Sequence, residues 1–253
     1  MGDPRDNVKR GHGFSLVGTA TFTLLRLADP FLQHQILTRH VGLSLLPKYF
    51  GGTLLPAGEA LSPFQLLMLG MAGGSALKHA FWALAVAKEE LPLPSAFMIA
   101  AFNTIFNSLS TVFSLWSVTS AVSGVGGSAE AIFTSPYVAA GTLLYVTGIF
   151  LETVSEIQRK RFKDDERNKG KPYSGGLFGW ARHINYAGYT LWRGGYALAA
   201  GGPFWGAAVM AFFAFDFHTR GIPALDQYCR KRYGDAWTEV KRKVPFVMIP
   251  GIW

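Results

Sequence analysis

Long apolar blocks separated by short polar segments are the feature that most constrains the fold of this chain. The blocks cover residues 14–28, 64–87, 95–122 and 133–151. A helix needs about 20 mainly apolar residues to cross the hydrocarbon core of a bilayer. Only 16% of the residues are charged, whereas soluble domains carry about 25%, and the mean hydropathy is +0.21. The sequence therefore predicts an all-α, multi-pass membrane protein with about six spans, in a range of five to seven.

The basic residues lie mainly in the short segments between these blocks. The chain carries 24 Lys and Arg against 16 Asp and Glu, a formal net charge of +8. Cytosolic loops of membrane proteins are enriched in Lys and Arg, so the charge indicates a lipid bilayer as partner and requires no nucleic acid. The same cations could also bind a phosphate-bearing cofactor. The chain has one cysteine and six scattered histidines, so we predict neither a disulfide nor a metal site.

The first apolar block leaves the topology of the N-terminal region open. Residues 14–28 are closed by Asp29 and Pro30, and Arg26 and Asp29 could sit at the interfacial end of a helix. The amphipathic residues 31–46 could extend this helix, lie in the interface or form a poor second span.

The second block, residues 64–87, is interrupted by Lys78. A lysine within a span usually faces the protein interior or water, and a lysine at a helix end can extend to the membrane surface. Both positions are open for Lys78. Gly70, Ala72, Gly73 and Gly74 form a small-residue face that predicts close helix packing.

Two amide side chains lie in the third block. Asn103 and Asn107 are four residues apart and therefore share one helical face. Interhelical hydrogen bonding is the simpler role for them, and lining a substrate cavity is the alternative.

The C-terminal half predicts a helical hairpin. Residues 190–200 and 204–217 are each too short for a comfortable span, and Gly201-Gly202-Pro203 divides them. The block 133–151 continues without a helix breaker to Lys163, so this helix should project beyond the membrane. With the hairpin, three polar segments return to one side of the membrane: residues 152–163, 171–189 and 216–237.

These polar segments contain residue types that suit a dinucleotide. Arg and Lys bind phosphate oxygens, Asn pairs with amides or base edges, and aromatic side chains stack on rings. A Gly-x-Gly-x-x-Gly turn after a strand is missing from the sequence, so such a site is not a Rossmann site. The residues that the topology gathers are Arg159, Lys163, Lys171, Arg182, His183, Asn185, Tyr186, Asp226, Arg230 and Tyr233.

Three motifs in the same half resemble those of known membrane enzymes. Residues 182–188 read Arg-His-Ile-Asn-Tyr-Ala-Gly, which resembles the Arg-His-Pro-Asn-Tyr-x-Gly signature of the steroid 5α-reductase C-terminal and DUF1295 families. Residues 152–158, with Phe162, are similar to the Glu-x-x-Ala-Asp-x-Gln…Phe element upstream of that signature. Residues 229–251 are similar to the tail of sterol C14- and Δ7-reductases. The resemblance covers residues 133–253.

The resemblance implies a reductase. In such enzymes NADPH binds from the cytosolic side and gives a hydride to a C=C bond of a sterol-like or other lipophilic enone, while an acidic group supplies a proton. It implies a cofactor-binding core at 133–253, substrate-side helices at 1–132 and a location in the endoplasmic reticulum. It adds Phe178 to the cofactor residues above. The catalytic candidates are Tyr189, Glu152 and His183, and the substrate candidates are Asn103, Asn107 and Glu156.

Two departures from the family pattern keep other functions open. Ile184 replaces the usual proline, and Tyr189 stands where many members carry an acid. A tyrosine could itself donate a proton. Isoprenylcysteine and phospholipid methyltransferases share a similar core and an Arg-His-Pro-x-Tyr-x-Gly motif, with S-adenosylmethionine as cofactor. The alternatives are therefore such a methyltransferase or a non-catalytic binding protein of the same fold.

Overall fold

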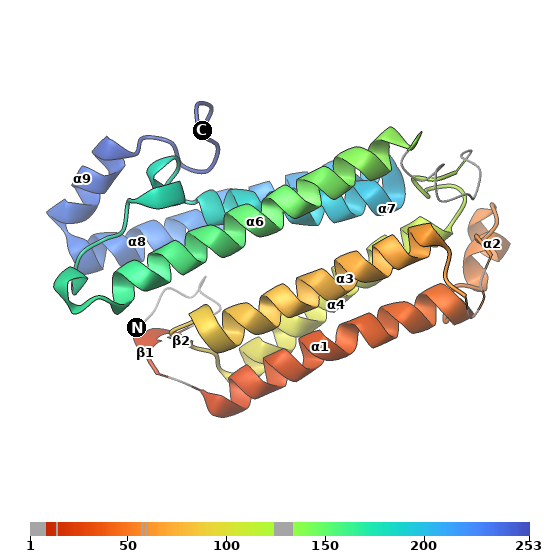
Figure 1. The fold of residues 1–253 in the computed structure, drawn as a ribbon, viewed down its shortest axis with the longest axis horizontal. Coiled ribbons are helices and arrows are strands. Elements are labelled where there is room, and N and C mark those ends of the chain that lie inside the picture. Colours follow the sequence, from red (N-terminus) through yellow and green to blue (C-terminus); the bar gives the residue numbers. More distant parts are fainter. Residues whose placement is uncertain (1–8, 14, 57, 59, 124–133) are drawn as a thin grey trace.

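The computed structural model describes residues 9–13, 15–56, 58, 60–123 and 134–253, and these are mostly helical (Figure 1). The all-α prediction is confirmed, and the described residues add one pair of short antiparallel strands. In chain order the elements are β1 (Lys9–His12), α1 (Leu16–Arg39), α2 (Leu45–Phe50), α3 (Pro63–Phe81), η1 (Trp82–Val86), β2 (Glu89–Glu90), α4 (Leu93–Leu115), α6 (Pro136–Asp164), η2 (Glu166–Asn168), η3 (Gly176–Gly179), α7 (Ile184–Asp216), η4 (Phe217–Gly221), α8 (Ile222–Tyr233) and α9 (Asp235–Lys243). The boundary predicted between residues 132 and 133 lies outside the described residues.

The long helices run side by side along the long axis of the molecule (Figure 1). Within the described residues, three helical stretches are long and apolar enough to cross a membrane: Leu93–Leu115, Pro136–Asp164 and Ile184–Tyr233. They are compatible with an integral membrane protein. Helices α1 and α3 lie alongside them but are not among these three stretches, so the number of about six spans stays a prediction.

The stretch from α7 to α8 turns back on itself. Gly201 (φ −116°, ψ 17°) and Gly202 (φ 73°, ψ −170°) leave the helical conformation, and Pro203 begins the second arm. The rings of Tyr186 and Phe217, near the open ends of the arms, stack at 4.3 Å and 4°. The Ala121 amide donates to the Ala200 carbonyl at 3.0 Å, which satisfies one of the carbonyls that the turn frees. The arms form the helical hairpin that the Gly-Gly-Pro interruption predicts.

Gly202 is required by this turn, because its backbone conformation is accessible almost only to glycine. We expect Gly202→Ala to lower the free energy of unfolding by about 1–3 kcal/mol. Thermal unfolding in detergent measures the change. Gly73→Ala is the control, since a Cβ at Gly73 has no atom within 4 Å in the helix α3. Equal unfolding temperatures for Gly202→Ala and the wild type would contradict the assignment.

Helix α1 continues through Asp29 and Pro30 to Arg39. Arg26 and Asp29 are buried in the bundle rather than at an interfacial end. They pair with each other at 3.3 Å, and Arg26 donates to Thr104 of α4 at 3.0 Å. Pro30 lies within this continuous helix. Residues 31–39 therefore extend the first helix.

The polar elements gather at one end of the bundle (Figure 1). The C-terminal end of α6, the helices α8 and α9 and the strands β1 and β2 lie there, whereas α2 lies at the opposite end. The apolar arms of α6 and α7 pack along their length through glycines on both helices. This arrangement places the three polar segments of the C-terminal half on one side.

Candidate functional site

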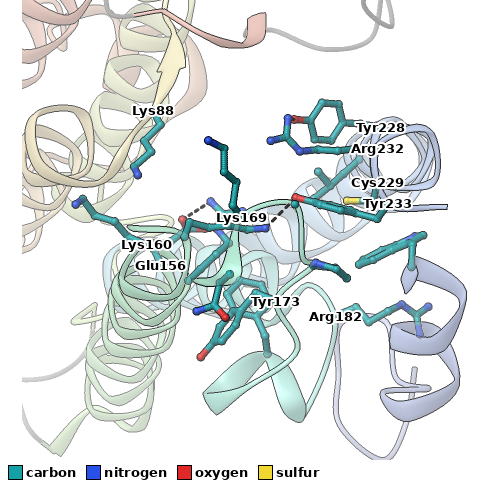
Figure 2. Close-up of a pocket in the computed structure, with 18 of the residues that line it drawn as sticks. Lys88, Glu156, Lys160, Lys169, Tyr173, Arg182, Tyr228, Cys229, Arg232 and Tyr233 are labelled. Carbon is teal, nitrogen blue, oxygen red and sulfur yellow. Dashed lines mark hydrogen bonds and ion pairs between the residues drawn. The ribbon is translucent and has the colours of Figure 1, made fainter. Parts of the chain in front are cut away.

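A cavity of about 580 Å³ lies at the polar end of the bundle (Figure 2). Its walls come from the end of α6, the segment 165–173, η3 and helix α8. Lys88 and Glu89, which precede α4, close another side, and Figure 2 shows Lys88 and Lys160 facing Tyr228, Arg232 and Tyr233 across the space.

Seven of the predicted site residues line this cavity. They include six of the cofactor residues and one residue predicted for substrate: Arg159, Lys163, Phe178, Arg182, His183, Tyr233 and Glu156. The structure therefore brings the three polar segments together. Glu156, which was predicted to bind the substrate, lies in the wall of this cavity.

Glu156 is the centre of a buried hydrogen-bonded group at the cavity wall. Its carboxylate accepts from Arg159 Nη2 at 2.5 Å and from Asn185 Nδ2 at 2.8 Å. Asn185 does not line the cavity itself. Its Oδ1 atom is buried and has no hydrogen-bond partner among the described residues. A buried acceptor without a donor is unfavourable, so this atom is available for a ligand's N–H group.

Lys163 and Tyr233 form the opposite part of the lining. Lys163 Nζ donates to Tyr233 Oη at 2.9 Å and also to the carbonyl of Lys171. The Lys171 side chain is exposed and does not line the cavity. Of the two lysines predicted to bind the cofactor, Lys163 lines the cavity and Lys171 does not.

Arg182 and His183 are fixed by the C-terminal tail. Arg182 Nη1 donates to the carbonyls of Val244 at 2.6 Å and Pro245 at 2.9 Å. The amides of Arg182 and His183 donate to residues 246 and 247 at 3.0 and 2.8 Å. Burial lowers the pKa of the Arg182 guanidinium, and the charge of Asp226 opposes this shift. Arg182 lines the cavity, but it also anchors the tail.

Three predicted cofactor residues lie behind the lining. Tyr186 stacks on His183 with a centroid distance of 5.4 Å. Asp226 accepts from Trp237 Nε1 at 2.7 Å and pairs with Arg230 at 3.4 Å, and Arg230 is exposed. Asp226 thus joins α8 to α9, and neither it nor Arg230 faces the cavity.

Sequence reasoning missed part of the lining. Three aromatic residues, Tyr173, Tyr228 and Trp237, and the cations Lys88, Lys160, Lys169 and Arg232 also line the cavity. Burial raises the pKa of the Tyr173 phenol. Seven cations now face four acids: Lys88, Arg159, Lys160, Lys163, Lys169, Arg182 and Arg232 against Glu89, Glu156, Asp165 and Glu166. The basic run at 159–171 signalled four of the seven cations, and Arg232 lies in the polar segment 216–237, but nothing local marked Lys88.

A second polar group lies deeper in the bundle, and we call it the inner cluster: Lys78, Asn103, Asn107, Glu152, Tyr189, Trp192 and Arg193. Glu152 forms an ion pair with Lys78 and accepts from Trp192 Nε1 at 2.7 Å. Lys78 therefore faces the protein interior rather than the membrane surface. Two of the three predicted catalytic residues, Glu152 and Tyr189, belong to this cluster.

Asn103 and Asn107 join the inner cluster across helices. Asn103 Oδ1 accepts from Tyr189 Oη at 3.3 Å and from Arg193 Nη2. Asn107 Oδ1 accepts from Arg193 Nη1 at 2.8 Å, and its Nδ2 donates to Asp29 at 2.5 Å. Both amides make the interhelical hydrogen bonds that were the simpler of their two predicted roles.

The cavity and the inner cluster lie one helical turn apart. Glu152 and Glu156 are four residues apart on α6, and Asn185 and Tyr189 are four residues apart on α7. Such pairs lie on one face of a helix, one above the other. The polar contacts therefore extend from the cavity wall at Glu156 into the apolar interior.

Comparison with known proteins shows to which family the chain belongs. Residues 93–244 match the family described as "Protein of unknown function (DUF1295)". The chain belongs to the DUF1295 family. The match begins at Leu93 and so includes α4 with its two asparagines, upstream of the region 133–253 that the motifs indicated. The DUF1295 protein is also 39% identical over 241 residues to the "Probable O-methyltransferase ustE" of Ustilaginoidea virens, which covers 90% of this chain and 84% of the relative.

Proposed function

We propose that this DUF1295 protein is a membrane enzyme that transfers a methyl group from S-adenosylmethionine to an oxygen of a lipophilic acceptor. The observation that carries the proposal is the similarity to a relative named a probable O-methyltransferase, which extends over 90% of the chain. The sequence motifs alone favoured reduction with NADPH and kept methyl transfer as the alternative. The relative's name supports the alternative over the first interpretation.

The residues of the cavity fit S-adenosylmethionine. Arg159 and Lys163 would bind its carboxylate, and Phe178 and Tyr173 offer aromatic faces for adenine. Glu156, held at the cavity wall by Asn185 Nδ2, would accept from the amino group of the cofactor. When bound, S-adenosylmethionine supplies an electrophilic methyl group, whose transfer to oxygen breaks a carbon–sulfur bond and leaves a neutral thioether.

The inner cluster provides the acceptor side of the proposal. Glu152 lies one turn below the cavity and is held between Lys78 and Trp192. We assign Glu152 the proton that the acceptor's hydroxyl loses, and Tyr189 the orientation of the acceptor's oxygen. The helices α1, α3 and α4 then hold the lipophilic acceptor, and the region 133–253 holds the cofactor.

Reduction of a C=C bond with NADPH is the second candidate. One observation favours it, because the lining has seven cations against four acids. A dinucleotide with three phosphate groups would use such an excess more fully than S-adenosylmethionine, which carries a positive sulfonium.

Cofactor binding to the purified protein in detergent tests the proposal. We expect saturable binding of S-adenosylmethionine and none of NADPH. Arg159→Gln should weaken binding roughly 10- to 100-fold, as expected for a lost charge-assisted hydrogen bond. Arg161→Gln is the matched control, because Arg161 lies on the same helix and is exposed. Saturable binding of NADPH alone would overturn methyl transfer, and binding of neither cofactor would overturn both candidates.

A further inference from the structure

Arg193 is a buried arginine without a carboxylate partner among the described residues. The residue is only 2% exposed. Its three hydrogen-bond acceptors are all neutral: Asn107 Oδ1 at 2.8 Å, Tyr189 Oη at 3.3 Å and Asn103 Oδ1. By contrast, Arg26 pairs with Asp29, and Lys78 pairs with Glu152. Arg193 is therefore the exception among these three buried cations.

The charges around Arg193 do not balance. Among the described residues, the buried cations are Arg26, Lys78 and Arg193, and the buried carboxylates are Asp29, Glu152 and Glu156. Glu156 is paired with Arg159 at the cavity wall, which leaves two carboxylates, Asp29 and Glu152, for the three cations of the interior. A buried charge without compensation costs several kcal/mol, and ionisable residues inside a membrane protein usually serve a ligand or a transport path. One negative charge near Arg193 would compensate the excess.

The surroundings of Arg193 define the kind of anion that fits. A guanidinium has five N–H donors, and the three hydrogen bonds leave two of them for another acceptor. Aromatic rings surround the guanidinium carbon, with centroids at 4.3 Å for Trp192, 5.6 Å for Tyr189, 5.9 Å for Phe213 and 6.0 Å for Phe106. Tyr189 is partly exposed although it lies within the bundle. The site suits an acidic oxygen on an aromatic, lipophilic molecule.

We infer that Arg193 binds the acceptor of the reaction through an acidic oxygen, either a phenolate or a carboxylate attached to an aromatic ring. Tyr189 and Asn103 hold the guanidinium in place through its other donors. This inference rests on the proposed function, since it names the class of acceptor for methyl transfer. It assigns a role in binding to a residue that the family motifs do not include.

Three small probes test the inference with the full-length protein in lipid nanodiscs: 2-naphthol, 2-naphthoic acid and 2-methoxynaphthalene. The probes share one ring system and differ in the acidic oxygen. We expect at least one acidic probe to bind roughly 10-fold more tightly than the methyl ether. Preference for 2-naphthol identifies a phenol as acceptor, and preference for 2-naphthoic acid identifies a carboxylate. Equal affinity for all three probes would overturn the inference.

Variants separate binding from folding. Arg193→Gln should abolish the preference for the acidic probe, and Arg193→Lys, which keeps the charge, should retain part of it. The exposed Arg161→Gln should bind the probes as the wild type does. If Arg193→Gln kept the full preference, Arg193 would be a packing residue only. Should Arg193→Gln fail to fold, the comparison of the acidic probes with the methyl ether on the wild-type protein still tests whether the site prefers an acidic oxygen.

The outcomes also distinguish this inference from the proposed function. A wild-type protein that binds S-adenosylmethionine but shows no preference among the probes overturns the role of Arg193 alone. A wild-type protein that prefers an acidic probe but binds no S-adenosylmethionine overturns methyl transfer and leaves the anion site.

Discussion

Replacing Glu152 by leucine is expected to lower the free energy of unfolding by about 3–5 kcal/mol, because it leaves a buried lysine without its partner. The side chains of Lys78 and Glu152 are only 7% and 12% exposed. The substitution also removes the acceptor that Trp192 Nε1 contacts at 2.7 Å. Leucine has a similar volume, so the loss reports the missing charge rather than a cavity. Unfolding in detergent, followed by Trp fluorescence, measures it.

A double-mutant cycle isolates the ion pair. Lys78→Met alone should also destabilise the protein, because it leaves the Glu152 carboxylate buried. The variant with both Lys78→Met and Glu152→Leu should recover much of the loss, since no buried charge of the pair remains. If the double variant were as unstable as the sum of the two single changes, the residues would not be coupled.

An exposed ion pair in the same protein provides the control. Lys88 and Asp164 form a salt bridge with side chains that are 47% and 39% exposed. Surface pairs contribute about 0–1 kcal/mol, so Lys88→Met should change the stability by less than about 1 kcal/mol. The contrast between the two lysines tests whether burial, and not the presence of a salt bridge, sets the effect.

Local features of the sequence predicted the parts of the fold that depend on local chemistry. The Gly-Gly-Pro interruption after Ala200 predicted the hairpin, because glycine readily adopts the positive φ that a turn needs and a proline cannot continue the preceding helix. The absence of a helix breaker after residue 151 predicted that α6 continues beyond the apolar block. Both features together predicted that the polar segments lie at one end, where seven of the predicted residues line a cavity.

Features that depend on distant partners could not be predicted in this way. Asp29 and Pro30 look like a helix end, yet α1 continues through them to Arg39. The partner of the buried Asp29, Asn107, lies 78 positions away in the chain. The sequence left two locations open for Lys78, the protein interior and the membrane surface. The ion pair with Glu152 of α6 locates it in the interior. Arg193 lies within an apolar segment, and its partner Asn103 is 90 positions away. The sequence therefore did not predict it as a site residue. Hydropathy along the chain does not show which buried polar groups meet.

The sequence predicted close helix packing on α3, and this holds for one of its three glycines. A Cβ at Gly74 would lie 2.6 Å from Tyr145 Oη of α6, whereas a Cβ at Gly70 or Gly73 has no atom within 4 Å. The close approach of two helix backbones occurs between α6 and α7. A Cβ at Gly188 would lie 2.6 Å from the backbone nitrogen of Glu152, and one at Gly195 would lie 2.5 Å from that of Tyr145. A small residue permits close packing, but only the partner helix decides whether it occurs.

Gly188→Ala is therefore expected to destabilise the protein by about 2–3 kcal/mol, although alanine favours helices by about 1 kcal/mol over glycine. The added methyl group would meet the backbone of α6 at Glu152 and Gly148, and a backbone cannot move aside as a side chain can. Unfolding in detergent measures the loss. Gly70→Ala in α3 is the matched control and should be neutral or stabilising, because its Cβ points into open space.

Gly188→Ala should also change the cofactor site in those molecules that remain folded. Gly188 lies between Asn185 and Trp192 on α7, and their partners Glu156 and Glu152 lie on the facing side of α6. Separating the two helices lengthens both contacts at once, so Gly188→Ala should weaken cofactor binding as well as stability. Gly195→Ala is the comparison, because it would separate the same helices farther from the cavity, at Tyr145. If both variants lose stability but only Gly188→Ala loses cofactor affinity, the close approach at Gly188 sets the geometry of the site; equal affinities would show that this approach serves packing alone.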